Sequence, residues 1–146
     1  MCKQGGTFSI STWFYEAWIA DVKHALSTLP NPPPWPQTSD ELIMGWATGP
    51  WHIPSFVKNM LLARGFVDVK VELLSVHMPM HNAEDFTDIY EAFVEMITGK
   101  YWTEEQRQRC RPLIRETVIR TINAKYGEGK PFTTERVNIM VTARKP

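Results

Sequence analysis

Residues 3–13 read KQGGTFSISTW, a glycine turn that leads directly into a segment of alternating apolar and polar residues. Phe8 and Ile10 alternate with serines, and this period of two predicts a β-strand over residues 6–12. Gly5 and Gly6 can adopt the positive φ that a tight turn before the strand requires. A core strand needs a neighbour, which we expect later in this chain, in another chain or in a segment that is missing.

The composition is that of an ordinary globular protein. Of the 146 residues, 43% are hydrophobic and 22% are charged, and 16 basic residues balance 16 acidic ones. A net charge of zero gives no overall field that would attract nucleic acid or an anionic membrane, and no apolar run is long enough to cross a bilayer. Cys2 and Cys110 form neither a metal-binding spacing nor a disulfide framework, so we expect a cytoplasmic protein.

Two further strands are predicted by the same alternation, one over residues 67–77 and the last over residues 135–144. Apolar residues at helical spacing predict a helical insertion between these strands, over residues 82–126. Earlier helices are expected over residues 14–29, 40–46 and 54–64. The sequence therefore predicts one α/β domain over residues 1–146, with about three strands and four to five helices.

Several residues mark the expected ends of helices. Asn82 is a good N-cap, and Thr103 and Gln106 fit a capping box that opens a helix. Gly65 is expected to terminate the helix before it, and Pro112 is expected to break or kink the helix that contains it.

A proline-rich run occupies residues 30–36 and excludes both helix and central strand. We expect a stiff, partly extended surface loop. The alternative is a ligand for an aromatic-lined groove of a partner protein.

These segments, in order, resemble the C-terminal half of a class I S-adenosylmethionine (SAM)-dependent methyltransferase. In that family a glycine turn leads into the fifth strand, and a helix, a helix–strand unit with Gly-Phe and an antiparallel last strand follow. The matching segments here are residues 5–8, 61–66 with 67–71, and 137–144. The resemblance covers most of the chain and implies a partial Rossmann-like sheet whose last two strands are antiparallel.

The resemblance implies SAM as the cofactor, but the chain has no counterpart of the glycine-rich loop that holds SAM in this family. No cofactor-binding residue can therefore be assigned. The implied reaction is methyl transfer to a small apolar or aromatic acceptor. The alternative is a truncated, non-catalytic methyltransferase that acts as a partner subunit or binding module. In either case we expect a second copy or a partner chain to cover the open edge of the strand at residues 6–12.

By the resemblance, the residues just past the end of that strand line the acceptor cleft: Thr12, Trp13 and Phe14. Tyr15 and Trp51 are further candidate walls of an apolar pocket. The remaining tryptophans are candidates too: Trp18, Trp35, Trp46 and Trp102. Plain core packing is the alternative for all of them, and it is the favoured interpretation for Trp18 and Trp102.

His52 lies in a loop just before Pro54 and is the candidate general base, since an unperturbed histidine has a pKa of about 6.5. A surface or hydrogen-bonded loop histidine is the alternative, and methyl transfer that relies on alignment needs no base. His77 and His81 flank Pro79 and would lie about 13 Å apart in an extended strand. We therefore expect no metal site there, and expect both to line the substrate mouth.

Charged residues cluster in the helical insertion, with arginines over residues 107–120 and carboxylates over residues 84–95. Complementary charged faces on adjacent helices explain this pattern better than RNA binding, because no aromatic stacking motif accompanies the arginines.

Overall fold

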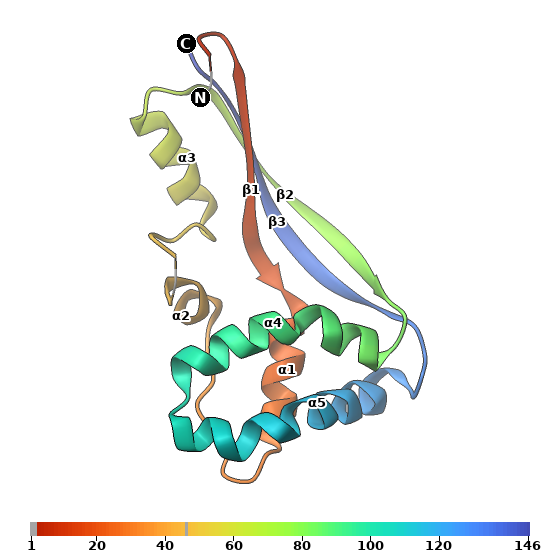
Figure 1. Cartoon of the computed structure of the whole chain (residues 1–146). Helices are drawn as coiled ribbons and strands as arrows, with labels where there is room; N and C mark the ends of the chain where they lie inside the picture. The colour runs from red at the N-terminus through yellow and green to blue at the C-terminus, as the bar shows by residue number, and fades with distance from the viewer. Residues whose placement is uncertain (1–2, 46) are drawn as a thin grey trace. The chain divides into compact units, whose positions relative to one another are not determined.

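The computed structural model describes residues 3–45 and 47–146 (Figure 1). Cys2 and the candidate pocket residue Trp46 lie outside the described residues. The elements are β1 (Thr7–Glu16), α1 (Ala17–Ser27), α2 (Ser39–Met44), α3 (Pro54–Ala63), β2 (Val67–Met80), α4 (Ala83–Tyr101), α5 (Glu104–Tyr126) and β3 (Phe132–Arg144). The described part of the chain is therefore α/β, with three strands and five helices, as expected.

The described residues form two compact units. The sheet unit contains residues 3–16, 38–45, 47–76 and 135–146, and the helical unit contains residues 17–37 and 77–134. β2 and β3 begin in one unit and end in the other, and α4 and α5 lie between them in sequence.

The sheet has the strand order β1-β3-β2, so the last strand of the chain lies between the other two (Figure 1). β1 and β3 are antiparallel, and Phe8 is paired with Ala143 and Ile10 with Val141. β3 also runs antiparallel to β2, as the resemblance implies (Figure 1). The neighbour that the first strand needs is thus the last strand of the same chain.

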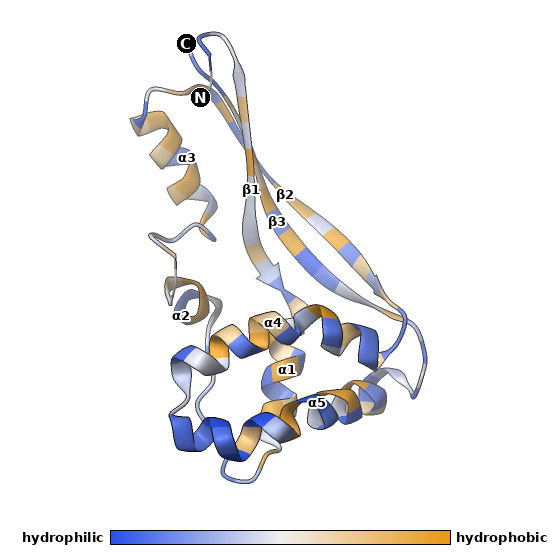
Figure 2. Ribbon diagram, in the orientation of Figure 1, coloured by the Kyte–Doolittle hydropathy of each residue, from blue (hydrophilic) through white to orange (hydrophobic). Residues whose placement is uncertain are grey.

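The core of the sheet unit lies between α3 and one face of the sheet. Val57 and Leu61 of α3 pack against Ile139, Val141 and Ala143 of β3, and all five side chains are buried. Apolar and polar residues alternate along β2 and β3 (Figure 2), which is the pattern of a sheet with one covered face.

The helical unit is held together by apolar and ionic contacts. Trp18 of α1 is buried and stacks on Tyr90 of α4, with 4.7 Å between the ring centroids. Trp102 is also buried, so the core interpretation of both tryptophans is confirmed. The charged clusters meet as expected, because Arg111 and Arg115 of α5 each form an ion pair with a carboxylate of α4.

The proline-rich run lies against the helical unit. The Trp102 Nε1–H donates to the Pro34 carbonyl at 2.8 Å, and Arg109 donates to the Asn31 carbonyl at 3.0 Å. Pro33 and Pro36 are buried. The run is therefore a docked loop, and its buried prolines are not displayed for a partner's groove.

Most of the predicted helix ends are confirmed. Asn82 caps α4 by accepting a hydrogen bond from the amide of Asp85, and Thr103 and Gln106 form the predicted capping box of α5. Gly65 follows α3 with a φ of 79°. The prediction of a break at Pro112 was wrong, because α5 continues through it. Pro112 is exposed, so water can solvate the carbonyl that loses its helical partner.

The predicted strand boundaries were too short. β1 extends to Glu16, so residues 14–16 are strand and not the start of a helix. Pairing with β3 outweighs the helical spacing of the apolar residues after Trp13, since aromatic side chains favour a sheet. β2 and β3 also extend beyond the predicted residues 67–77 and 135–144. Within the described residues, no helix is both long and apolar enough to span a membrane.

Candidate functional site

The end of β1 carries four of the residues that were expected to line the acceptor cleft. All four lie within the strand and not beyond it. Thr12 is paired with Ile139 and Trp13 with Asn138, whereas Tyr15 is paired with Val137. Phe14 is therefore the extra residue of a β-bulge.

The bulge decides which face each side chain occupies. Side chains alternate along a strand, so Val137 and Ile139 share a face, and their partners Tyr15 and Thr12 share it too. This is the face that packs on α3.

The aromatic residues at this end of β1 remain accessible. Phe14 is 40% exposed and Tyr15 is 41% exposed, while Thr12 and Trp13 are half-buried. The end of β1 therefore presents exposed aromatic surface.

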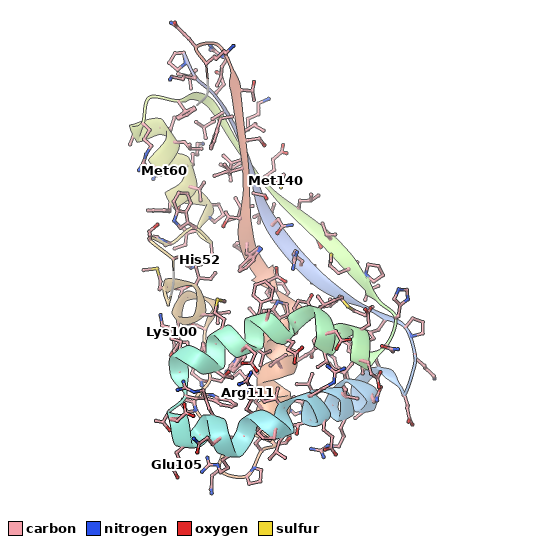
Figure 3. All side chains as sticks on the ribbon, in the orientation of Figure 1. His52, Met60, Lys100, Glu105, Arg111 and Met140 are labelled. Atoms are coloured by element: carbon pink, nitrogen blue, oxygen red, sulfur yellow. The ribbon has the colours of Figure 1, made fainter. Side chains whose placement is uncertain are left out.

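The candidate base His52 forms a dyad with Asp40. The distance from His52 Nε2 to Asp40 Oδ1 is 2.6 Å, and His52 is 6% exposed while the Asp40 side chain is 73% exposed. His52 precedes α3, and Asp40 lies in the first turn of α2, whose N-cap is Thr38 (Figure 3).

The contact with Asp40 selects between the two tautomers of a neutral histidine. When a neutral His52 donates its Nε2–H to Asp40, the lone pair of the imidazole lies on Nδ1. His52 Nδ1 is buried and has no hydrogen-bond partner among the residues that the structure describes. Nδ1 is therefore the only ring nitrogen of His52 that can accept a proton while the Asp40 contact is kept.

The other candidates lie in different surroundings. Trp51 is half-buried, meets Phe56 edge-to-face at 5.7 Å, and packs against the core of the sheet unit. His77 and His81 are exposed residues of the helical unit, and the amide of His81 donates to Asp85 Oδ2. Within residues 3–45 and 47–146, no group of three or more histidine, cysteine or acidic residues could hold a metal ion.

Sequence reasoning missed one charged groove, which lies between α1 and α5 of the helical unit. It has a volume of about 610 Å³ and is lined by Asp21, His24, Thr28, Arg120, Thr121, Ala124 and Lys125. The Lys125 Nζ lies 2.6 Å from Oδ1 of the buried Asp21. Burial lowers the pKa of Lys125, but the hydrogen bonds and charges of Asp21 and Tyr126 together outweigh burial, and the pKa lies above its usual value. No short-range sequence pattern links residues 21 and 125.

The glycine turn before β1 does not provide a cradle for SAM. The Gly5 amide donates to the Lys145 carbonyl and the Gly6 amide donates to the Lys3 carbonyl, so both amides are already satisfied. These two amides are therefore not free to bind the cofactor that the resemblance implies.

The chain is similar to three curated fungal proteins, whereas no family model matches it. It is 29% identical over 142 residues to the acetylaranotin bis-thiomethyltransferase of Aspergillus terreus. The aligned region is 97% of this chain and 51% of that protein. It is 26% identical to the methyltransferase ktnA of Aspergillus niger, over 99% of this chain and 46% of that protein. It is also 26% identical to the methyltransferase tpcH of Aspergillus fumigatus, over 97% of this chain and 49% of that protein.

The chain thus spans about half the length of the curated relatives it matches. Each of these relatives is named a methyltransferase. The similarity supports a methyltransferase-like function and is consistent with a partial methyltransferase.

Proposed function

We propose that this chain forms the acceptor-side half of a class I, SAM-dependent methyltransferase domain that acts on a small apolar or aromatic molecule. One observation carries the proposal: nearly the whole chain is similar to about half of each of three methyltransferases. The antiparallel last strand and the glycine turn before β1 support a Rossmann-like parent sheet.

The role of this chain in the proposed reaction is to bind and align the acceptor. Phe14 and Tyr15 provide exposed aromatic surface at the end of β1. Transfer between two bound molecules is accelerated chiefly by their alignment, so a rigid apolar wall is sufficient for this half. Where the acceptor must lose a proton, His52 would accept it at Nδ1 once that buried nitrogen is uncovered, and Asp40 would hold the ring in the required tautomer.

The cofactor would be held by the half that this chain does not match. β1 is at one edge of the described sheet, and its outer edge has no strand partner among the residues described. An open edge of this kind favours pairing with another strand. We propose that the SAM-binding half, in the same or another polypeptide, pairs there. A second copy pairing at this edge is the competing arrangement.

A second candidate function is a non-catalytic partner subunit. The open edge of β1 and the satisfied amides of Gly5 and Gly6 favour it, because both can exist without any cofactor site in this chain. The two candidates differ in whether an assembled complex transfers a methyl group.

Calorimetry with a complementing fragment tests the proposal. The fragment is the half of the Aspergillus terreus relative that this chain does not match. We expect no SAM binding by the chain alone, and saturable one-to-one binding of SAM once the fragment has bound. Methyl transfer from labelled SAM to an aromatic thiol or phenol should then appear in the mixture.

Two variants test whether the aromatic surface at the end of β1 is needed for methyl transfer. Tyr15→Ala should lower the rate of transfer at least tenfold, whereas Leu62→Ala, an equally exposed residue of α3, should not change it. A complex that binds SAM and transfers no methyl group to any acceptor would support the partner subunit. A fragment that does not bind the chain would contradict both candidates.

A further inference from the structure

One side of α4 carries an exposed apolar surface that the proposed function does not use. We call it the α4 stripe, and it consists of Ile89, Ala92, Phe93 and Met96. Ile89 is 44% exposed and Met96 is 42% exposed. Phe93 is half-buried, and its ring lies 5.7 Å from that of Trp18, which holds this wall of the stripe in place.

The contacts of α4 explain why this side is uncovered. Tyr90 contacts α1 through Trp18, so α1 covers one flank of the helix. The ion pairs Arg111–Glu95 and Arg115–Asp88 hold α5 against the opposite flank (Figure 3). With 3.6 residues per turn, Ile89, Ala92 and Met96 point away from both flanks, and Phe93 lies at the border with α1, where its ring meets Trp18. The stripe is therefore the outer ridge of α4 within the helical unit.

The residues of this ridge are arranged symmetrically about a single point in the sequence. The midpoint lies between Ala92 and Phe93. Ile89 and Met96 are equidistant from it on either side, and so are Asp85 and Lys100. An antiparallel pair of identical helices related by a two-fold axis places each residue opposite its mirror position. In such a pair Ile89 faces Met96, and Asp85 faces Lys100.

We propose that the α4 stripe binds the α4 stripe of a second copy of this chain, antiparallel and about a two-fold axis at residues 92 and 93. The small side chain of Ala92 permits a close approach of the two helices. This interface is separate from the edge of β1, so the proposal goes beyond the proposed function and does not rest on it.

The charges at the two ends of the stripe favour this orientation over the parallel one. In the antiparallel pair each Asp85 faces a Lys100, whereas a parallel pair would place Asp85 beside Asp85 and Lys100 beside Lys100. The Lys100 side chain is exposed and has no charged partner among the residues described (Figure 3). One oxygen of Asp85 accepts the amide of His81, and the other is available to a partner. Exposed pairs of this kind set orientation more than affinity.

The size of the surface sets the expected strength. A single pair of helices buries an area at the low end of specific interfaces, below about 1,200 Å² in total. We therefore expect a reversible dimer with a dissociation constant of about 1–100 μM.

Sedimentation velocity over a concentration series tests the dimer. The wild-type chain should shift from the mass of one chain to that of two as its concentration rises. Met96→Glu should raise the dissociation constant at least tenfold, because it buries a charge in the interface. Leu113→Glu is the matched control, since Leu113 is a comparably exposed residue of α5 and should leave dimerisation unchanged. A chain that stays monomeric at about 1 mM, or a Met96→Glu variant that dimerises normally, would overturn the proposal.

Cross-linking tests the register. Ile89→Cys and Met96→Cys are prepared separately, each with Cys2→Ser. In the proposed pair, residue 89 of one copy and residue 89 of the other are seven residues apart along the helix axis, as are the two copies of residue 96. This separation is about 10.5 Å, which is too far for a disulfide. Neither variant should cross-link with itself, whereas a mixture of the two should give a disulfide-linked dimer on mild oxidation. Self-cross-linking of Ile89→Cys would indicate a parallel pair, and a dimer that never cross-links would place the interface elsewhere. Either result refutes the proposed register.

Discussion

At the scale of single residues, the Asp21–Lys125 pair makes stability depend on pH in the alkaline range. The pKa of Lys125 is raised: burial opposes the shift, and the hydrogen bonds and charges of Asp21 and Tyr126 together outweigh burial. An unfolded lysine titrates near pH ~10.4. The stabilisation is therefore complete below that pH and is lost as the pH rises through the higher folded-state value. The wild type and Asp21→Asn are unfolded by urea at pH 8 and at pH 11. Between these two pH values, the free energy of unfolding should fall more for the wild type than for the variant.

The control for this prediction is Asp88→Asn, which removes an exposed ion pair of α4 and leaves Lys125 unchanged. Its loss of stability between pH 8 and pH 11 should equal that of the wild type. If Asp21→Asn loses as much stability between pH 8 and pH 11 as the wild type, the Asp21–Lys125 pair does not cause the loss of stability at alkaline pH.

Single residues also show how far the candidate site could be predicted. His52 was found because a histidine in a loop before a proline is visible in the sequence. Asp40 was not found, because its contact with His52 depends on how α2 and the turn before α3 meet. The same holds for Asp21 and Lys125, which are 104 residues apart. Side-chain pairs made by tertiary packing leave no short-range pattern.

At the scale of elements, the bulge at Phe14 can be tested by deletion. Removing Phe14 leaves Trp13 paired with Asn138 and Tyr15 with Val137, so the faces of β1 are preserved. We expect the free energy of unfolding to change by no more than about 1 kcal/mol. Deleting Ser11 instead would move Phe8 and Ile10 to the opposite face of the sheet. This deletion should cost about 3 kcal/mol or more, because two core side chains lose their packing.

Urea denaturation of both deletion variants measures the difference. Equal losses of stability would show that Phe14 is needed for the fold. A tolerated Phe14 deletion that weakens acceptor binding would assign the bulge to the display of an aromatic side chain, a use that bulges near active sites commonly have.

The elements themselves were largely predictable, and the errors have physical causes. Alternation and helix caps are local, so the three strands and the caps at Asn82 and Thr103 followed from the sequence. The run Trp13-Phe14-Tyr15 has no alternation, so neither the end of β1 nor its bulge could be read from it. Pro112 was overestimated as a helix breaker, because the helix around it is supported by contacts with α4.

At the scale of the whole molecule, the proposals assign two separate surfaces to two partners. The outer edge of β1 is assigned to the half that the chain does not match, and the α4 stripe is assigned to a second copy. Hydrogen exchange separates them. In the isolated chain, the amides of β1 that point away from β3 should exchange rapidly, since no strand pairs with them among the residues described. Binding of the complementing fragment should protect these amides and leave α4 unchanged.

Met96→Glu completes this test, because it should abolish dimerisation and still allow the fragment to protect β1. Rapid exchange along β1 should therefore respond to the fragment and not to the concentration of the chain. If raising the concentration of the wild type alone protects the outer amides of β1, a second copy pairs at that edge. The assignment of the two surfaces would then be reversed, because the copy would occupy the position proposed for the SAM-binding half.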